Sequence, residues 1–459
     1  MAFITDSQTL EDLRILGKRG EDSVLGMFDR TRTRGGAELL EEMFRYPLSD
    51  AAAIQYRSGI IRHFATAGTD FPFESELFDI TDAYLADTDE RTKLSRDENT
   101  LGSRFNHLIG ADTEYINIYK GVISVIRIMQ VLKDFLETNG DFDARGHSFA
   151  GAANGSPYRA DSRATRALLA DAALAPLWAE QANAKLSYAK VADYDLLLRF
   201  RHRETIKKIL RYIYHLDVYL SVGRVAVERK LTFAEAMAGN GHSLLIEGVY
   251  HPFLKHPVPN TLLMMADNNV LFLTGANMAG KSTFMKALGI ALFLAHMGFP
   301  VPAGKMTFSV LDGIYTTINL SDNLGTGASH FYAEVLRVKK VARELSLSKN
   351  LFVIFDELFR GTNVKDAYEA TVAITAAFAE KRSSMFVISS HIMEAGEVLK
   401  ERCNNIGFQY LPTHMNGHTP VYTYTLETGI TADRHGMVII NNEGILDILE
   451  RGRQKKIKP

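Results

Sequence analysis

"LFLTGANMAGKSTFMKALG", residues 271–289, determines the class of the C-terminal half of the chain. Its centre, 275–282, fits G-x-x-x-x-G-K-[ST], between a strand-like apolar run and a helix-like run. Glycines let backbone amides converge on phosphate oxygens, and the helix starting at Lys281 directs the positive end of its dipole there. Lys281 would pair with the β- and γ-phosphates, and the Ser282 hydroxyl would ligate Mg²⁺. A glycine-rich turn without a ligand is the alternative. We expect a phosphate site whose contacting residues are Gly275, Ala276, Asn277, Met278, Ala279, Gly280, Lys281, Ser282 and Thr283.

Two later apolar runs end in polar residues that would complete this site. "LFVIFDE", 351–357, predicts a buried strand that places Asp356 near the metal and Glu357 beside the γ-phosphate. Asp356 would hold Mg²⁺, and Glu357 would orient or deprotonate the attacking water. His391 follows "MFVISS" at another strand end, where a doubly wound sheet places ligand groups, and could sense the γ-phosphate. Solvated strand ends and a surface histidine are the alternatives.

The segment "SDNLGTGASHFYAEV", 321–335, is polar and leads into a helix predicted from about Ser329. A helix N-terminus with a hydroxyl can bind an anion, here a phosphate from a second subunit, but its pattern equally fits a simple N-cap. The basic tail, 451–459, reads "RGRQKKIKP" and is either a solvated end or a nucleic-acid contact.

Composition restricts the protein class. The 459 residues are 46% hydrophobic, enough for two or three domains with full cores. With 52 basic and 54 acidic residues the formal net charge is -2, so no strong overall field favours DNA or an anionic membrane. A single cysteine, Cys403, excludes a disulfide framework. The start lacks a signal-peptide pattern and the most apolar windows are short for a bilayer, so we expect a cytoplasmic protein without a membrane segment.

The chain changes its pattern part-way along. Residues 5–232 carry helical periodicity, interrupted by a Gly-, Ala- and Ser-rich loop predicted over 140–162. Two long helical stretches flank that loop and would form either a rigid arm or an ordinary bundle. From about 243, short apolar runs alternate with helical segments, which predicts a sheet covered by helices. The run "TPVYTYTLETG", 419–429, predicts a further strand near the end. The expected fold is multidomain, α and α/β, with a helical domain over 1–235 and a phosphate-loop domain over 236–459.

With these residues in place, the chain resembles the MutS family of mismatch-repair ATPases. The loop "GANMAGKST" is similar to the family's G-P-N-M-G-G-K-S-T, and "FDELFRGTN", 355–363, to its D-E-x-G-R-G-T-S. "DRTRTRGGAELLEEMFRYPLSDAAAIQYRSGIIRHF", 29–64, resembles the start of its core domain. "YTLETGITADRHGMVIINNEGILDILER", 424–451, resembles its last strand and helix. The family's S-D-D-L…S-T-F…E signature falls on Ser321, Asp322, Leu324, Ser329, Phe331 and Glu334.

The resemblance implies a core/lever domain followed by an ABC-type ATPase domain that uses ATP and Mg²⁺. "GVYHPFL", 248–254, resembles the family segment beside the adenine, which implies nucleotide contact for Phe253. In the family two ATPase domains pair, so Ser329 would act in trans on the γ-phosphate in an ATP-stabilised homodimer. The implied function is an ATPase that binds mismatched or branched DNA and couples nucleotide state to lever movement.

Departures from the family leave a second reading open. The core pattern begins almost at Met1, so we expect neither the mismatch-reading nor the connector domain, and no DNA-gripping clamp pattern occurs between residues 140 and 185. Ala276, Ala279 and Phe359 stand where the family usually has Pro, Gly and Gly, and Asn323 replaces a signature Asp. The alternative is an ATP-dependent switch that clamps a protein partner without contacting DNA. A transporter ATPase is disfavoured because the Leu-Ser-Gly-Gly-Gln signature is missing.

Overall fold

The computed structural model describes residues 3–17, 22–94, 111–139, 158–181, 185–238, 241–318, 330–416 and 419–431, with Ile445, Ile448 and Leu449. The chain divides into two compact units. The first contains Met1–Met27, Tyr46–Ser58 and Arg229–Pro459, and the second contains Phe28–Arg45 and Gly59–Glu228. The sequence pattern predicts one domain boundary near residue 235, whereas in these units the chain passes from one to the other more than once.

A six-stranded sheet with the order β14-β11-β5-β10-β9-β8 organises the first unit. Its members except β14 are parallel, and β14 runs antiparallel to β11. Every residue of β5, β8, β9 and β10 is buried, which explains their continuous apolar runs, because helices cover both faces of a parallel sheet. The strands are β5 Val270–Gly275, β8 Gly313–Thr317, β9 Leu351–Phe355, β10 Met385–Ser389, β11 Ile406–Leu411 and β14 Glu427–Thr428.

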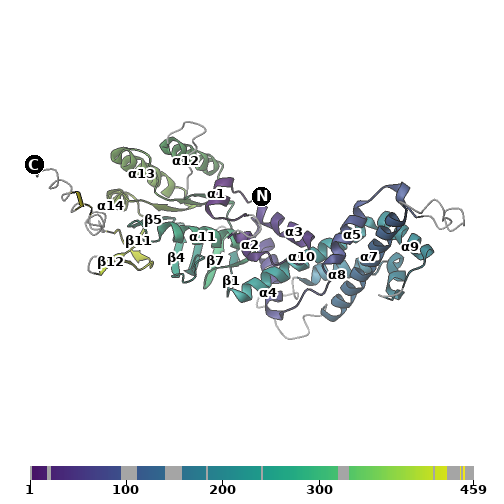
Figure 1. The fold of residues 1–459 in the computed structure, drawn as a ribbon. Coiled ribbons are helices and arrows are strands. Elements are labelled where there is room, and N and C mark those ends of the chain that lie inside the picture. Colours follow the sequence, from purple (N-terminus) through teal and green to yellow (C-terminus); the bar gives the residue numbers. More distant parts are fainter. Residues whose placement is uncertain are drawn as a thin grey trace, which may run out of the picture. The chain divides into compact units, whose positions relative to one another are not determined.

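Helices cover both faces of this sheet, as predicted (Figure 1). Alternate strand residues, such as Val353 and Phe355, enter one core with α12, α13 and α14. Ile354 lies between them and faces α11, where its Cδ1 would be 3.5 Å from a Cβ built on Gly289. The helices are α11 Lys281–His296, α12 His330–Ser346, α13 Val364–Ala379 and α14 Met393–Arg402.

Smaller sheets complete the first unit. A four-stranded sheet has the order β2-β7-β3-β4, with β2 Glu235–Met237, β3 Ser243–Val249, β4 Asn260–Met265 and β7 Lys305–Ser309. Two antiparallel pairs join β1 Thr232–Phe233 with β6 Pro300–Val301, and β12 Thr413–Asn416 with β13 Thr419–Tyr422. The single strand predicted over 419–429 was wrong, because β13 and β14 belong to different sheets. The chain turns between them at Tyr424, whose φ is 57°.

The second unit is helical, as predicted. Its elements are α3 Arg34–Arg45, α5 Glu76–Ala86, η1 Glu90–Thr92, α7 Ala111–Asn139, α8 Tyr158–Leu169, η3 Ala172–Ala179, α9 Tyr188–Asp195, η4 Leu196–Arg201 and α10 Arg203–Glu228. The remaining helices are α1 Ser7–Asp12 in the first unit, and α2 Val24–Phe28 and α4 Ala51–Ala67, which start in the first unit and end in the second.

Two sequence predictions for this unit need correction. The loop predicted over 140–162 was wrong from Tyr158, where α8 begins, and 140–157 lie outside the described residues. The second long helix is interrupted by the π-helix η4 before α10 starts at Arg203. Part of α7, Thr113–Thr138, is apolar and long enough to cross a bilayer, a test that core helices also meet, and half of its most apolar window is buried.

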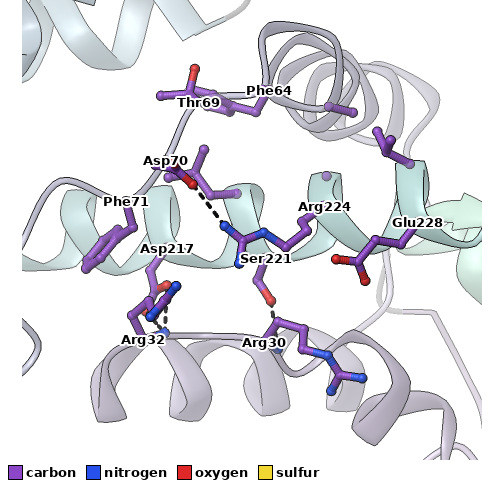
Figure 2. A pocket seen from close by; sticks show the side chains of 15 residues that line it. Arg30, Arg32, Phe64, Thr69, Asp70, Phe71, Asp217, Ser221, Arg224 and Glu228 are labelled. Carbon is purple, nitrogen blue, oxygen red and sulfur yellow. Dashed lines mark hydrogen bonds and ion pairs between the residues drawn. The ribbon is translucent and has the colours of Figure 1, made fainter.

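Asp217 of α10 fixes the turn that precedes α3 (Figure 2). Its carboxylate accepts hydrogen bonds from the backbone N–H groups of Arg32, at 2.9 Å, and Thr33, at 2.8 Å, and from the Thr33 hydroxyl at 2.7 Å. One turn along α10, the Ser221 hydroxyl accepts from the backbone N–H of Arg30 at 2.8 Å. Residues 30–33 belong to no helix or strand, so Asp217 and Ser221 supply acceptors for backbone N–H groups that secondary structure would otherwise pair.

Candidate functional site

The loop 275–282 joins β5 to α11, with the strand and helix on either side that the motif requires. Gly275 has a φ of 146° and Gly280 a φ of 101°, backbone conformations that side chains with a Cβ rarely adopt. Met278 also has a positive φ, 68°, and its side chain is exposed. The two glycines therefore permit the sharp path that returns the chain to the helix N-terminus.

Lys281 is buried at the start of α11 and its side chain folds back over the loop. Its Nζ donates to the carbonyl oxygens of Gly275, at 2.8 Å, and Ala276, at 3.1 Å. Burial lowers the pKa of Lys281 below its ordinary value, and the negative charges of Glu357 and Asp356 oppose that shift. The ammonium group is therefore held at the loop by weak acceptors that an anionic ligand could replace.

Asp356 follows β9 and lies between two hydroxyl groups. Ser282 Oγ donates to its Oδ2 and Ser389 Oγ to its Oδ1, each at 2.5 Å. Burial raises the pKa of Asp356 above its ordinary value, against the opposing effect of these two bonds. The carboxyl ends of β5, β9 and β10 lie at one sheet edge, so residues far apart in sequence meet here.

Ser282 and Asp356 supply the hard oxygen donors that Mg²⁺ prefers. The 2.5 Å contact between them shows that both converge on one point. Across the described residues, no group of three or more His, Cys, Asp or Glu side chains forms a ligand set. The residues fit a cation that takes its other ligands from phosphate and water.

Glu357 adjoins Asp356 in the chain, with a φ of 55°, and is held on both oxygens. His391 Nε2 hydrogen-bonds its Oε1, and Arg360 contacts its Oε2 at 3.2 Å. The bond with His391 is the largest cause that lowers the pKa of Glu357 to about 2, while burial opposes it. Glu357 is therefore ionised at neutral pH.

A cavity of about 570 Å³ opens beside the loop. The ring of Tyr424 closes one side, 2.9 Å from the position of a Cβ built on Gly280. Asn260 Nδ2 donates to the Tyr424 carbonyl at 2.9 Å, and Asn260 Oδ1 accepts from the Leu426 N–H at 2.7 Å, which fixes this turn. Burial, aided by Lys286 and Arg14, lowers the pKa of the lining residue His251 to about 4, so its imidazole is neutral. The rings of His251 and Tyr424 thus border the same pocket as the loop.

Family models match both parts of the chain, MutS domain III over residues 8–223 and MutS domain V over residues 271–458. The chain belongs to the MutS family. A similar protein from Fusobacterium nucleatum subsp. nucleatum, named DNA mismatch repair protein MutS, is 27% identical over 260 residues, which are 55% of this chain and 28% of that protein. A protein of the same name from Persephonella marina is 28% identical over 265 residues, 56% of this chain and 30% of that protein. The matches thus span less than a third of these relatives.

The structure brings together most of the residues predicted for a MutS nucleotide site. Besides Glu357, the predicted residues that line the cavity are Ala276, Asn277, Met278, Gly280, Lys281, Ser282 and Thr283. His391 and Asp356 reach it through their hydrogen bonds to Glu357 and Ser282. Phe253 is not among the lining residues, although its neighbours His251 and Leu254 are, and its nucleotide contact stays a prediction. Ser329 lies outside the described residues.

Several site residues of this MutS chain were missed by the sequence reasoning. Ser389 lies in "MFVISS" and Arg360 in "FDELFRGTN", so their nearness to the acids and to His391 in the chain is a signal that the sequence carries. Tyr424 and Asn260 come from positions 164 residues apart, and no local pattern connects them.

Proposed function

We propose that this chain is an ATPase of the MutS type, with a phosphate-loop site of the ABC class in the domain predicted over 236–459. The observation that carries the proposal is the convergence of Lys281, Ser282 and Asp356 at one sheet edge, with the Ser282 hydroxyl 2.5 Å from the Asp356 carboxylate. A buried ammonium group and a hydroxyl–carboxylate pair are the groups that a triphosphate and its cation require.

The phosphates of ATP would lie along the loop and the base in the adjoining cavity. Lys281 would exchange its bonds to two loop carbonyls for bonds to phosphate oxygens, which gain more from a positive charge. The cavity wall formed by Leu254, Val258 and the Tyr424 ring suits the flat apolar face of a base. Phe253 remains a further candidate for that contact.

Ser282 and Asp356 would hold Mg²⁺, Ser282 directly and Asp356 through water. The cation, when bound, supplies charge neutralisation at the β- and γ-phosphates. The Asp356 carboxylate has a raised pKa because of burial, so a nearby positive charge would favour its ionised form.

Glu357 would orient the attacking water. The water oxygen bonds to the γ-phosphorus while the bond from that phosphorus to the bridging oxygen breaks. A carboxylate with a pKa of about 2 accepts a hydrogen bond well but holds a proton weakly, so we assign Glu357 to orientation, with the proton passing on to the phosphate product. His391, bonded to Glu357 Oε1, would sense the γ-phosphate by donating a hydrogen bond to one of its oxygens.

We further infer a homodimer through the ATPase domains, in which Ser329 of one subunit approaches the γ-phosphate bound to the other. ATP would stabilise this dimer, because a ligand favours the state that binds it better. The ligand whose binding is coupled to ATP hydrolysis would be DNA, mismatched or branched, in a cytoplasmic process related to mismatch repair. The alternative is a protein partner clamped without DNA contact.

The test is steady-state phosphate release by the full chain, with and without Mg²⁺ and with added duplex, mismatched or branched DNA. We expect Mg²⁺-dependent release, and absence of ATP binding would overturn the site assignment. DNA binding should weaken steeply with salt, since phosphate contacts release counterions. A flat salt response together with ATP turnover would favour the protein-clamp alternative.

The dimer has its own test in sedimentation velocity. Glu357→Gln with ATP and Mg²⁺ should accumulate a dimer, and the added change Ser329→Ala should release it. A Glu357→Gln protein that binds ATP yet stays monomeric at all accessible concentrations would exclude the trans mechanism.

A further inference from the structure

Residues 4–12, here called the strap, lie along the β8 edge of the six-stranded sheet. The Ile4 N–H donates to the Asp312 carbonyl at 2.8 Å, and the Ile314 N–H donates to the Ile4 carbonyl at 3.0 Å. A Cβ built on Gly313 would lie 2.3 Å from the Ile4 carbonyl oxygen, so this approach requires glycine. The strap therefore extends the sheet beside β8.

Asp6 ties the strap to α12 through a largely buried ion pair. Both guanidinium NH groups of Arg337 contact the Asp6 carboxylate, and Lys340 Nζ donates to its Oδ2 at 2.6 Å. Only 12% of the Asp6 side chain and 8% of the Arg337 side chain are exposed, so solvent screens this contact little. Asp6 also accepts from the Thr9 N–H and thus caps α1.

Arg337 also donates hydrogen bonds to the end of β8. Its Nε donates to Thr317 Oγ1 at 3.1 Å, and one of its NH groups donates to the Thr316 carbonyl at 2.7 Å. The planar guanidinium presents several donors in fixed directions, so it holds the strap, α12 and β8 in one arrangement.

Asp12 secures the end of β8 from the other side of the strap. Its Oδ2 accepts from the Thr316 hydroxyl at 2.8 Å and from the Ile318 N–H at 2.9 Å, and the side chain is buried. Thr9 Oγ1 accepts from the Thr316 N–H at 3.0 Å. The strap thus supplies the partners of polar groups that β8, at the sheet edge, would otherwise leave unpaired.

This network is one hydrogen bond away from the candidate site. The Asp356 N–H donates to the Thr317 carbonyl at 2.9 Å. The position of the Thr317 backbone therefore sets where the Asp356 backbone lies, and the Asp356 side chain meets Ser282.

We propose that Asp6 and Asp12 are positioning residues for nucleotide hydrolysis, which act through Arg337, Thr316 and Thr317 on Asp356. The proposal rests on the ATPase function proposed above. The strap fixes the position of the end of β8, and the Thr317 carbonyl of β8 in turn fixes the backbone of Asp356. The Asp356 side chain is thereby kept in place beside Ser282. Neither aspartate touches nucleotide in this scheme, so loss of either should slow turnover more than it weakens binding.

The test compares Asp12→Asn and Asp6→Asn with wild type in the full chain, at a temperature where circular dichroism shows all of them folded. Asn also caps helices, so Asp6→Asn keeps the start of α1 and gives a variant that folds if Asp12→Asn does not. We expect the kcat for ATP to fall about 10- to 100-fold, the order of effect of a small misplacement of a reacting group, with KM within about twofold. Amide hydrogen exchange should be at least about tenfold faster at Asp356.

The control is Glu344→Gln, which removes the 2.8 Å ion pair with Lys349 near the far end of α12. It should leave kcat and Asp356 exchange at wild-type values. Strap variants that match this control overturn the proposal, and so does faster Asp356 exchange with unchanged kcat, or a lower kcat with unchanged exchange. If the wild type releases no phosphate, the ATPase function fails by itself. Exchange at Asp356 then decides whether the strap positions that residue.

Discussion

The two units of this MutS-family chain use buried charge in different ways. In the helical unit, the Arg199 guanidinium pairs with both oxygens of Asp195, and also bonds Asp87 and Thr92. The Asp217 carboxylate there accepts three hydrogen bonds from the turn before α3. Each of these charges has permanent partners from the fold, which is how a buried charge serves a structure.

In the other unit, the buried charges near the loop have partners that a ligand could replace. Lys281 bonds two carbonyls of its own loop, and Asp356 bonds two hydroxyls. Burial favours the neutral form of each group, because it lowers the pKa of Lys281 and raises the pKa of Asp356. Ionisable groups with shifted pKa values that meet at one place in a structure are typical of functional sites. The comparison predicts that changes here affect turnover, whereas changes in the helical unit affect stability.

The largest effect is expected for Lys281→Ala. The change removes the positive charge beside the phosphates, so turnover should fall below detection and nucleotide affinity should drop, while the melting temperature changes little. Steady-state phosphate release and equilibrium ATP binding measure both. Turnover within twofold of wild type would place the phosphate site elsewhere.

Glu357→Gln should retain ATP binding and slow hydrolysis about 100-fold, the order of effect when a reacting group is no longer held in position. The reason is that the amide cannot accept hydrogen bonds at both of its polar atoms. Single-turnover hydrolysis and ATP titration separate the two quantities. An equal loss of affinity and rate would instead make Glu357 a metal ligand or a structural residue.

The sequence made one part of this comparison predictable. The loop, the two acids and His391 follow from local patterns, because a strand, a turn and the residues after it are adjacent in the chain. The ends of parallel strands meet at one edge, so the meeting of these segments could also be expected. The helical character of the second unit followed from periodicity.

Contacts between distant segments could not be predicted in this way. Arg337 and Asp6 are 331 positions apart, and neither belongs to a motif. The loop prediction over 140–162 relied on Gly, Ala and Ser content and so extended past the real start of α8 at Tyr158. The strand predicted over 419–429 failed because alternating apolar residues do not reveal the left-handed turn at Tyr424.

In the helical unit, Asp217→Ala should lower the free energy of unfolding by about 4 kcal/mol. The change leaves three donors of the turn, the N–H groups of Arg32 and Thr33 and the Thr33 hydroxyl, without their acceptor, at about 1.3 kcal/mol each. Urea unfolding measures the effect, and turnover at low temperature should stay near wild type. The matched control is Asp70→Asn, which breaks an exposed ion pair with Arg224 in the same region and should cost less than about 1 kcal/mol (Figure 2). Equal losses in both variants would remove the distinction drawn for Asp217.

The smallest predicted effect tests whether the first unit also contains a buried titratable group with permanent partners. His296 is fully buried, its Nδ1 lies 2.9 Å from the Leu292 carbonyl, and its Nε2 accepts from the Leu311 N–H at 3.0 Å. Burial lowers the pKa of His296 to about 4, from 6.5 for an exposed histidine. Between these values the unfolded chain binds a proton that the folded chain does not. The contribution of His296 to the free energy of unfolding is therefore complete above pH 6.5, declines as the pH falls toward 4, and changes no further below it.

The decline should total about 3 kcal/mol, at 1.36 kcal/mol for each pH unit. Urea unfolding across this range measures it against His296→Gln, which retains a donor and an acceptor but does not titrate. If the two proteins lose stability in parallel, other groups cause the pH dependence and His296 is not held neutral by its partners.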